Sequence, residues 1–285
     1  NENGWRIELD GKTQDFNHSD FTYTKDETQC KIDCAIVYIH GDPGENGKVQ
    51  AYLDIIKIPY INSGPLASQL SFDKWYCNQF LKGFGLNVAH SIYLNDKNNW
   101  PESELIANEL KLPLFVKPCD SGSSFGIAKV AHIQDIDKAI SDAFQEGETV
   151  ILESFLDGIE VTCGVYRSTE GIQALPLTEI VTNNDFFDFQ AKYNGESEEI
   201  TPARIDSAIT EEIQELSKYI YSLLKLRSIA RIDYMIVMNE VYIIEVNTTP
   251  GFSNESIVPK MIENSDLSIT QVWSEIVKAE LNTNT

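Results

Sequence analysis

The chain has 285 residues, of which 42% are hydrophobic and 23% charged, close to the average for globular proteins. At about 150 residues per domain, this length suggests two domains or three small ones. Lys and Arg number 22 against 44 Asp and Glu, so the net charge is −22. This charge excludes nonspecific nucleic-acid binding and argues against an anionic membrane surface, because both need surplus cations. A bound phosphate would therefore have to meet a local concentration of the few basic residues.

Cysteine usage and hydropathy favour a protein of the reducing cytoplasm. The five cysteines form no CxxC pair and their number is odd, so neither a zinc site nor a disulfide framework is predicted. No apolar run reaches the roughly 18 residues of a membrane span, and Asn1–Asp10 lacks the order of a signal peptide. We expect a cytoplasmic protein with no membrane and no nucleic acid among its partners.

Short apolar runs alternate with helical patterns in the first half of the chain. Residues 1–33 are polar, and we expect them to be irregular apart from one short strand. Strands are predicted at Trp5–Leu9, Cys34–Ile39, Ile58–Ile61, Val88–Leu94, Leu114–Lys117 and Ile127–Val130. Helices are predicted at Val49–Lys57, Leu66–Leu81 and Ile133–Gln145. Gly and Pro are dense at 40–47, which predicts a loop there.

The second half predicts more strands, one long helix and two terminal helices. The strands are expected at Val150–Phe155, Glu160–Arg167, Ile229–Met238 and Val241–Val246, and the long helix at Ile209–Leu226. Residues 182–202 are polar and rich in aromatic residues and have no clear period, which is typical of a lid or binding loop. The order of elements predicts an α/β or α+β fold.

Two catalytic motifs can be rejected from their context. Residues 122–126 fit the GxSxG pattern, but a predicted strand follows them, whereas a nucleophile elbow opens into a helix. Residues 41–48 have five residues between their glycines and a Val after the Lys, so they are not a Walker A loop.

The Gly- and Ser-rich loop that follows Leu114–Lys117 has two interpretations. Successive small residues expose backbone N–H groups that can surround phosphate oxygens, and Lys117 adds a positive charge at the end of the strand. The same composition would also suit an ordinary surface turn. The loop by itself does not decide between them.

The two strands Ile229–Met238 and Val241–Val246 predict a hairpin with chemistry on one face. A three-residue connection at 238–240 would pair Asp233 with Glu245 and Arg231 with Asn247. Two opposed carboxylates repel unless a cation lies between them, and carboxylate and amide oxygens are ligands that Mg²⁺ prefers. A solvated outer face of the sheet would carry the same pattern without a metal.

Seven segments together resemble the D-alanine–D-alanine ligases of the ATP-grasp superfamily. They are HGDPGENG (40–47), SFDK (71–74), LFVKPCDSGSSFG (114–126), ESFLDGIEVT (153–162), DFQAKYNG (188–195), ARIDY (230–234) and EVNTTPGFSNESIVP (245–259). They keep the family's order and spacing over about 220 residues. A set of seven ordered motifs is far more specific than any one of them.

The resemblance implies a three-domain ATP-grasp fold. The N-terminal substrate-binding domain would be residues 1–73, the central ATP-grasp domain 74–157 and the C-terminal ATP-grasp domain 158–285, with a mobile loop at 182–202. The family opens with a strand and a Gly-Gly-x-Ser-x-Glu segment, which is not found in this sequence. We therefore expect the Rossmann-like N-terminal domain to be incomplete.

The resemblance also implies ATP as co-substrate and two Mg²⁺ ions, with Mn²⁺ as an alternative. The positions that match ATP-binding residues are Lys74, Lys117, Ser123, Ser124 and Lys192 around the phosphates, Glu153 at the adenine and Glu160 at the ribose. Asp233, Glu245 and Asn247 match the metal ligands.

Further positions match residues that act on the substrates. Arg231 matches an arginine that stabilises oxyanion charge, and Lys192 and Tyr193 lie at the working end of the lid. Ser123 and Tyr193 match members of a hydrogen-bonded link in the family. Substrate contacts are implied at His40 and Glu45, and Ser256 with the Ile257 amide matches the site for the second substrate's carboxylate.

The activity implied is ATP-dependent joining of two D-alanines through an acyl phosphate, for peptidoglycan synthesis, by a homodimer. One alternative is a ligase that uses D-lactate or another acceptor, although Tyr193 favours D-alanine. A different alternative is a nucleotide-binding module without ligase activity, which the missing N-terminal segment would allow. Binding of ATP without D-alanine-dependent turnover would separate the module from the enzymes.

Overall fold

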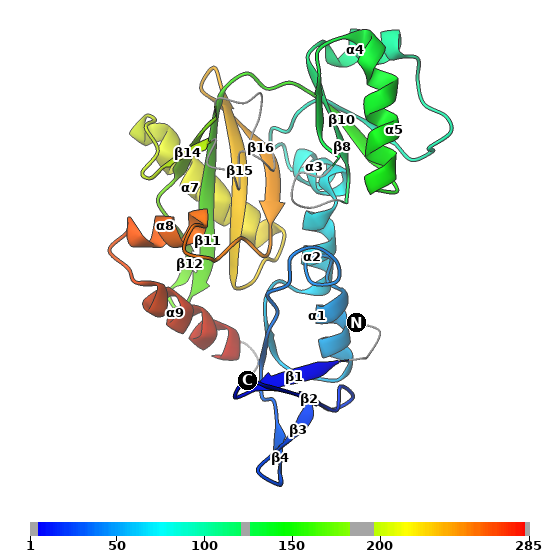
Figure 1. Ribbon diagram of the computed structural model, residues 1–285. Coiled ribbons are helices and arrows are strands. Elements are labelled where there is room, and N and C mark those ends of the chain that lie inside the picture. The colour runs from blue at the N-terminus through cyan, green and yellow to red at the C-terminus, as the bar shows by residue number, and fades with distance from the viewer. Residues whose placement is uncertain (1–4, 121–125, 183–196, 283–285) are drawn as a thin grey trace.

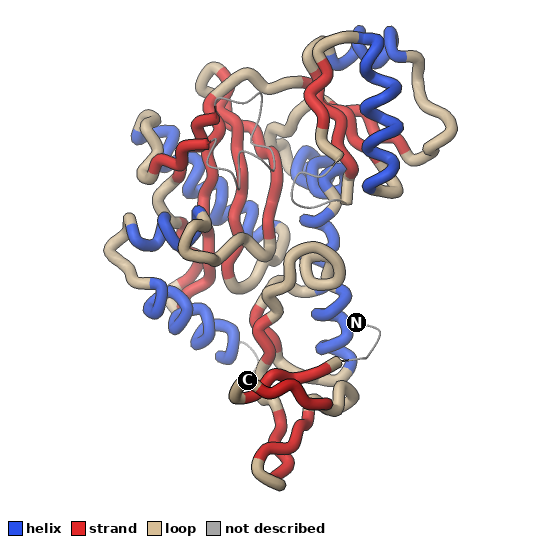
Figure 2. Tube along the Cα trace, viewed as in Figure 1, coloured by secondary structure: helices blue, strands red, loops and turns tan. Residues whose placement is uncertain are grey.

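The computed structural model describes residues 5–120, 126–182 and 197–282. Within these ranges the strands form a six-stranded sheet, a four-stranded sheet and three two-stranded pieces. The two larger sheets lie beside each other, with the N-terminal elements below them (Figure 1). Figure 2 shows the same arrangement with strands in red and helices in blue. The predicted mixed class of helices and sheets is confirmed.

Short strands surround one helix in the N-terminal unit, residues 5–64. Its elements are β1 (Arg6–Leu9), β2 (Lys12–Asp15), β3 (Thr22–Lys25), β4 (Thr28–Lys31), β5 (Ala35–Ile36), α1 (Lys48–Ile55) and β6 (Tyr60–Ile61). β1–β2 and β3–β4 are antiparallel hairpins, and β5 pairs with β6 in parallel. A small core that includes Phe21, Val37, Leu53 and Tyr60 holds the unit together.

The expectation that residues 1–33 are irregular outside one strand is wrong, because two hairpins form there. Both turns use consecutive residues with positive φ: Asp10 and Gly11 at 50° and 74°, and Asp26 and Glu27 at 47° and 62°. This is the backbone of a type I′ turn, for which Asp-Gly is a favoured pair. The predicted strand at Trp5–Leu9 is present as β1, which alternates exposed and half-buried residues. The strands β2, β3 and β4 are mostly polar, so they lack the apolar alternation that predicts a strand.

The single helix predicted over Leu66–Leu81 is two helices, α2 (Pro65–Phe72) and α3 (Lys74–Gly83). Asp73 is extended between them, and its carboxylate accepts a hydrogen bond from the Tyr76 amide at 3.0 Å. The break arises because Asp is a good N-cap residue, while the apolar period continues through it. Lys74 thereby becomes the first residue of α3.

The four-stranded sheet is antiparallel, with two helices packed on it. Its strands β7 (Ser91–Leu94), β8 (Leu114–Pro118), β9 (Ala128–Val130) and β10 (Val150–Ser154) lie in the order β7-β10-β8-β9. The helices are α4 (Ser103–Leu110), which was not predicted, and α5 (Ile136–Glu146), which follows a 3₁₀ turn at Ile133–Asp135. A core around Ile106, Ile140 and Leu152 is fully buried between sheet and helices. Because β9 follows residue 126, the strand that argued against a nucleophile elbow is confirmed.

The six-stranded sheet forms the larger core. Its strands are β11 (Ile159–Ser168), β12 (Gly171–Ala174), β13 (Thr178–Thr182), β14 (Ser197–Ile200), β15 (Ile229–Val237) and β16 (Glu240–Asn247). The order is β14-β13-β11-β15-β16, and β12 pairs with β11. Helices α7 (Ser207–Leu223), α8 (Ile257–Glu263) and α9 (Ile269–Asn282) pack on it. Residues 197–200, predicted as part of an irregular loop, are strand β14.

Side chains along β15 alternate between the buried core and the face that carries the predicted site residues. Ala230, Ile232 and Tyr234 are fully buried in the core shared with α7, whereas Arg231 and Asp233 on the opposite face are only partly buried. Residues two apart on a strand share a face, so Arg231 and Asp233 project together. The core of α7 also includes Ala67, Cys77 and Leu81, so α2 and α3 pack against this sheet.

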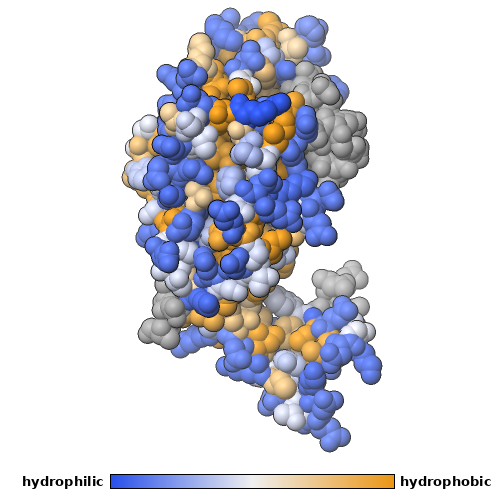
Figure 3. Space-filling model, turned by 90° about the vertical axis from the view of Figure 1, so that its left-hand side faces the viewer, coloured by the Kyte–Doolittle hydropathy of each residue, from blue (hydrophilic) through white to orange (hydrophobic). Residues whose placement is uncertain are grey.

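The visible surface is mostly polar. In Figure 3 hydrophilic side chains cover most of the visible face, between smaller hydrophobic areas. Within the described ranges no helix has both the length and the apolar character that a membrane crossing would need.

Candidate active site

A cavity of about 400 Å³ is lined by both larger sheets and by the segment that connects them. Predicted site residues gather on its wall: Lys74, Lys117, Glu153, Glu160, Asp233 and Glu245. Apolar side chains, among them Phe115, Ile180 and Met235, form the rest of the lining. An apolar pocket with a few convergent polar groups is typical of a small-molecule site. The strong charges of the sequence motifs therefore meet in one place.

Lys117 and Glu153 form a buried ion pair on neighbouring strands of the four-stranded sheet. Lys117 Nζ lies 2.6 Å from Glu153 Oε2, and the two side chains are 13% and 7% exposed. Asn78 Nδ2 donates to the other carboxylate oxygen at 3.1 Å. Asn78 was not predicted, although it lies one turn after Lys74 on α3, where i and i+4 side chains share a face.

The hairpin β15–β16 has the predicted register at its functional end. Arg231 lies opposite Asn247, and Asp233 lies opposite Glu245. The predicted three-residue connection is wrong: Val237 pairs with Glu240, and the turn is Met238-Asn239, with φ of 50° and 69°. A bulge between Asp233 and Tyr234 shifts the register by one residue and restores the predicted pairs. Bulges of this kind are common beside active sites.

Asp233 is held by three side chains. Arg231 donates to both carboxylate oxygens, from Nε at 2.8 Å and from Nη2 at 2.7 Å. Thr162 donates its hydroxyl at 2.6 Å, and Asn247 donates from Nδ2 at 3.1 Å. Burial alone would lower the pKa of Arg231, but the adjacent Asp233 carboxylate raises it overall. The guanidinium therefore keeps its positive charge in the site.

The donor set at the hairpin fits a hard divalent cation. Asp233, Glu245 and Asn247 offer carboxylate and amide oxygens, which are what Mg²⁺ takes. No group of three or more His, Cys, Asp or Glu with metal-binding geometry occurs in the described part of the chain. Two carboxylates with an amide suit an ion that keeps waters or substrate phosphate as further ligands.

The loop at 40–47 approaches the same end of the hairpin. Glu45 Oε2 accepts a hydrogen bond from the Gly41 amide at 2.7 Å, which closes the loop. Burial raises the pKa of Glu45, and His40, Glu245 and Arg231 are near enough to act on it electrostatically. The loop thus brings His40 and Glu45 to the side of the site where Arg231 lies.

Two hydrogen bonds tie the N-terminal unit to the segment after β16. The Tyr38 hydroxyl donates to the Pro250 carbonyl, and Asn62 Nδ2 donates to Thr249 Oγ1 at 3.1 Å. Neither contact was predicted, because each joins residues about 190 or more positions apart in the chain.

Ser256 and Ile257 lie at the start of α8, outside the lining of the cavity. Ser256 Oγ accepts a hydrogen bond from the Ser253 amide at 3.0 Å. A Cβ at Gly251 would lie 2.8 Å from Ser256 Oγ, so a larger residue there would displace this hydroxyl. The turn therefore holds the Ser256 hydroxyl in one place.

Four predicted residues, Ser123, Ser124, Lys192 and Tyr193, lie outside the described residues. The strands on either side of 183–196 are paired, with Thr182 opposite Ser197. Thr162 was also missed, although it is two residues after Glu160 on one strand face, which is a usable signal.

Two adjoining sheets with a charged cavity between them agree with the ATP-grasp fold that the resemblance implies, and solved structures support this class. The VanG D-Ala:D-Ser ligase from Enterococcus faecalis has a TM-score of 0.81 at 31% identity, covering 93% of this chain and 77% of that one. D-alanyl-alanine synthetase A from Vibrio cholerae has a TM-score of 0.81 at 26% identity, covering 94% and 82%.

Sequence comparisons identify the family more narrowly than the solved structures do. A family model described as D-ala D-ala ligase C-terminus matches residues 80–278. The D-alanine–D-alanine ligase of Azobacteroides pseudotrichonymphae is 45% identical over 97% of this chain and 86% of its own length. The corresponding ligase of Parabacteroides distasonis is 44% identical over 97% and 84%. The chain belongs to the D-alanine–D-alanine ligase family.

Proposed function

We propose that this protein joins two D-alanines at the expense of ATP, through an acyl phosphate, to supply the dipeptide for peptidoglycan. The observation that carries this proposal is the meeting of Lys74, Lys117, Glu153, Glu160 and the hairpin carboxylates on one cavity in a chain of this family. The chain has 22 Lys and Arg against 44 Asp and Glu, so the position of two lysines on the cavity wall is informative.

The cavity would bind ATP between its charged groups and its apolar walls. Lys74 and Lys117 would hold the phosphates, Glu153 would accept from the adenine amino group, and Glu160 would bind the ribose. The apolar residues between them suit a flat base. Ser123, Ser124 and Lys192 complete this proposal by resemblance to the family.

Asp233, Glu245 and Asn247 would hold two Mg²⁺ ions, or Mn²⁺ in their place. The ions would neutralise the repulsion between a substrate carboxylate and the triphosphate. The protein's part is to present oxygen ligands from one hairpin, whose carboxylates line the same cavity as Lys74 and Lys117.

Arg231 would stabilise the negative charge that develops when an amine attacks the acyl phosphate. A fixed cation in a largely buried place is more effective there than in water. His40 and Glu45 would contact the first D-alanine, and Ser256 with the Ile257 amide would bind the carboxylate of the second. We assign Lys192, Tyr193 and Ser123 to the closed site, because an acyl phosphate must be kept from water.

The proposal also includes a cellular compartment and an oligomeric state. We propose a cytoplasmic homodimer with domains at 1–73, 74–157 and 158–285. The five free thiols agree with a reducing compartment.

The direct test is ligation with D-alanine, ATP and Mg²⁺. We expect D-alanyl-D-alanine and inorganic phosphate in equal amounts, with no product from L-alanine. Because one structural neighbour is a D-Ala:D-Ser ligase, D-serine is a second candidate acceptor, and D-lactate is a third. Competition between acceptors measures the preference. Exclusive formation of another product, or ATP binding without turnover, would refute the proposal.

Gly251→Ala should affect the second substrate alone. The added methyl would lie 2.8 Å from Ser256 Oγ and would displace this hydroxyl. We expect the KM for the second D-alanine to rise by about tenfold, as for the loss of one hydrogen bond to a charged group. The KM for ATP should not change. Gly83→Ala is the control, because nothing lies within 4 Å of its Cβ position. An equal change in both variants would contradict the role of Ser256.

A further inference from the structure

The carboxylate of Asp233 has no acceptor position left for another ligand. Oδ1 accepts from Arg231 Nε and the Thr162 hydroxyl, and Oδ2 accepts from Arg231 Nη2 and Asn247 Nδ2. A carboxylate has about four acceptor positions, so these donors use them all. A metal ion can bind Asp233 only if at least one of these donors leaves.

Thr162 is the donor that stays. It lies directly opposite Asp233 in the ladder between β11 and β15, and it is 2% exposed. Its side chain is short and branched, with few rotamers available. The ladder between the two strands therefore keeps Thr162 beside Asp233, and its hydroxyl also lies 3.3 Å from the Ile232 carbonyl.

Arg231 and Asn247 can each give up the hydrogen bonds that they donate to Asp233. The amide of Asn247 can rotate and present its oxygen in place of its nitrogen. Arg231 shares a face with Asp233 and reaches it through a long side chain, so its guanidinium can move without a change in the backbone. Glu245 and Glu160 are also within electrostatic range of Arg231, so the displaced guanidinium would meet other negative charges.

We infer that Arg231 is the resident counter-cation of Asp233 in the metal-free protein and leaves it when the hairpin is loaded with a divalent ion. The pair keeps the opposed carboxylates of Asp233 and Glu245 from repelling each other while no metal is bound. No covalent bond changes: Asp233 exchanges two N–H donors for one metal contact. Arg231 then becomes available to the substrate only in the loaded protein. This inference rests on the proposed function.

Metal affinity measures the exchange without recourse to activity. Mn²⁺ alone is titrated into the full chain, and the bound fraction is followed by electron paramagnetic resonance. Arg231→Met should bind Mn²⁺ about tenfold more tightly, because the metal no longer competes with a charge-assisted bidentate pair. Lys117→Met is the matched control, since it also removes one positive charge from the candidate site, but Lys117 pairs with Glu153 and not with Asp233. Its effect should be much smaller.

Equal gains in Mn²⁺ affinity in the two variants would mean that net charge alone explains the effect, and this would overturn the inference. No gain in Mn²⁺ affinity in Arg231→Met would overturn it as well. The unmodified protein gives a second test that does not depend on how either variant folds. A crystal structure with Mn²⁺ and a non-hydrolysable ATP analogue should show Mn²⁺ on Asp233, Thr162 still bonded to it, and Arg231 beyond hydrogen-bond distance. An intact Arg231–Asp233 pair beside bound metal would overturn it.

The two proposals fail separately. Ligation of D-alanine by a protein whose Arg231–Asp233 pair persists with metal would contradict only the exchange. Exchange without ligation would contradict only the proposed function.

Discussion

Asp233→Asn should lower D-alanine-dependent turnover by about two to three orders of magnitude. The substitution removes one of two opposed carboxylates and weakens the bidentate pair with Arg231. Lewis-acid stabilisation is worth several kcal/mol, and about 1.4 kcal/mol corresponds to a tenfold rate change. Steady-state phosphate release at saturating Mg²⁺ measures the effect, and the melting temperature checks the fold.

The control for this substitution is Asp157→Asn. Asp157 is exposed and lies on the rim of the same cavity, so the variant removes the same charge from the same place. A surface change of this kind is usually worth less than about 0.5 kcal/mol, so turnover should change by about twofold at most. Near-normal turnover in Asp233→Asn, or equal losses in both, would contradict the metal assignment.

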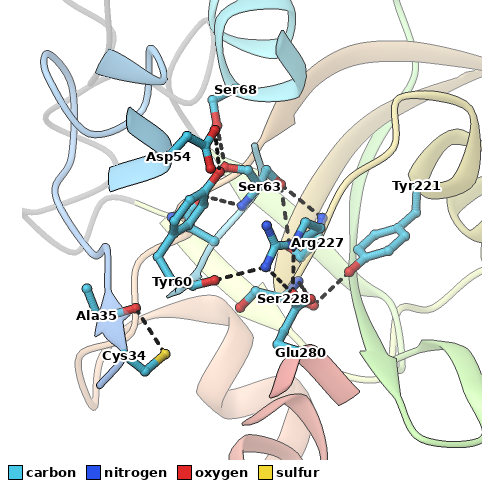
Figure 4. A network of polar contacts seen from close by, with 11 residues as sticks. Cys34, Ala35, Asp54, Tyr60, Ser63, Ser68, Tyr221, Arg227, Ser228 and Glu280 are labelled. Atoms are coloured by element: carbon cyan, nitrogen blue, oxygen red, sulfur yellow. Dashed lines mark hydrogen bonds and ion pairs between the residues drawn. The ribbon is translucent and has the colours of Figure 1, made fainter. Parts of the chain in front are cut away.

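Glu280→Ala should destabilise the protein by about 3 kcal/mol, because removing one partner of a buried ion pair leaves the other uncompensated. Glu280 is 2% exposed on α9 and accepts from Arg227 Nε at 2.7 Å and from the Ser228 amide at 2.9 Å. Arg227 also donates to the Tyr60 carbonyl at 2.9 Å. Figure 4 shows how these contacts join the N-terminal unit, the start of β15 and α9.

Urea unfolding of this variant gives the free-energy change directly. Glu280→Gln keeps an acceptor for the Ser228 amide, so its loss should be smaller than that of the Ala variant. Lys278→Ala, exposed on the same helix, should stay within about 0.5 kcal/mol of the parent protein. A loss below 1 kcal/mol in Glu280→Ala would show that the pair behaves like a surface ion pair, which is worth about 0–1 kcal/mol.

The hairpin shows how far the sequence could be read. Face sharing and opposed pairing predicted Asp233 against Glu245 and Arg231 against Asn247, and the structure confirms both pairs. The connection between the two strands differs from the prediction, because a two-residue turn and a bulge replace the predicted three-residue connection. A bulge has no composition of its own, so only the structure could reveal it.

Other misses have local physical causes. The strands β2, β3 and β4 are mostly polar and contain no fully buried residue, so the apolar alternation that predicts strands is missing there. The break at Asp73 leaves the apolar period of the helices unchanged, so periodicity could not detect it. Asn78 and Thr162 were within reach, since spacing places each on the face of a residue that was predicted.

The contacts that join the N-terminal unit to the large sheet were not accessible from the sequence. Tyr38 with Pro250, and Tyr60 with Arg227, connect residues more than 160 positions apart. No local pattern encodes such pairs. They decide where the loop with His40 and Glu45 lies relative to Arg231, so this side of the candidate site could be predicted only through the family resemblance.

In the proposed reaction, ATP activates the carboxylate of the first D-alanine as an acyl phosphate. This step can be tested with D-alanine whose carboxylate carries ¹⁸O. Attack of that carboxylate on the terminal phosphate, followed by displacement by the second amine, leaves one carboxylate oxygen in the released phosphate. We therefore expect one ¹⁸O atom in inorganic phosphate for each dipeptide formed, measured by mass spectrometry. Phosphate without label, or label in AMP, would contradict the account.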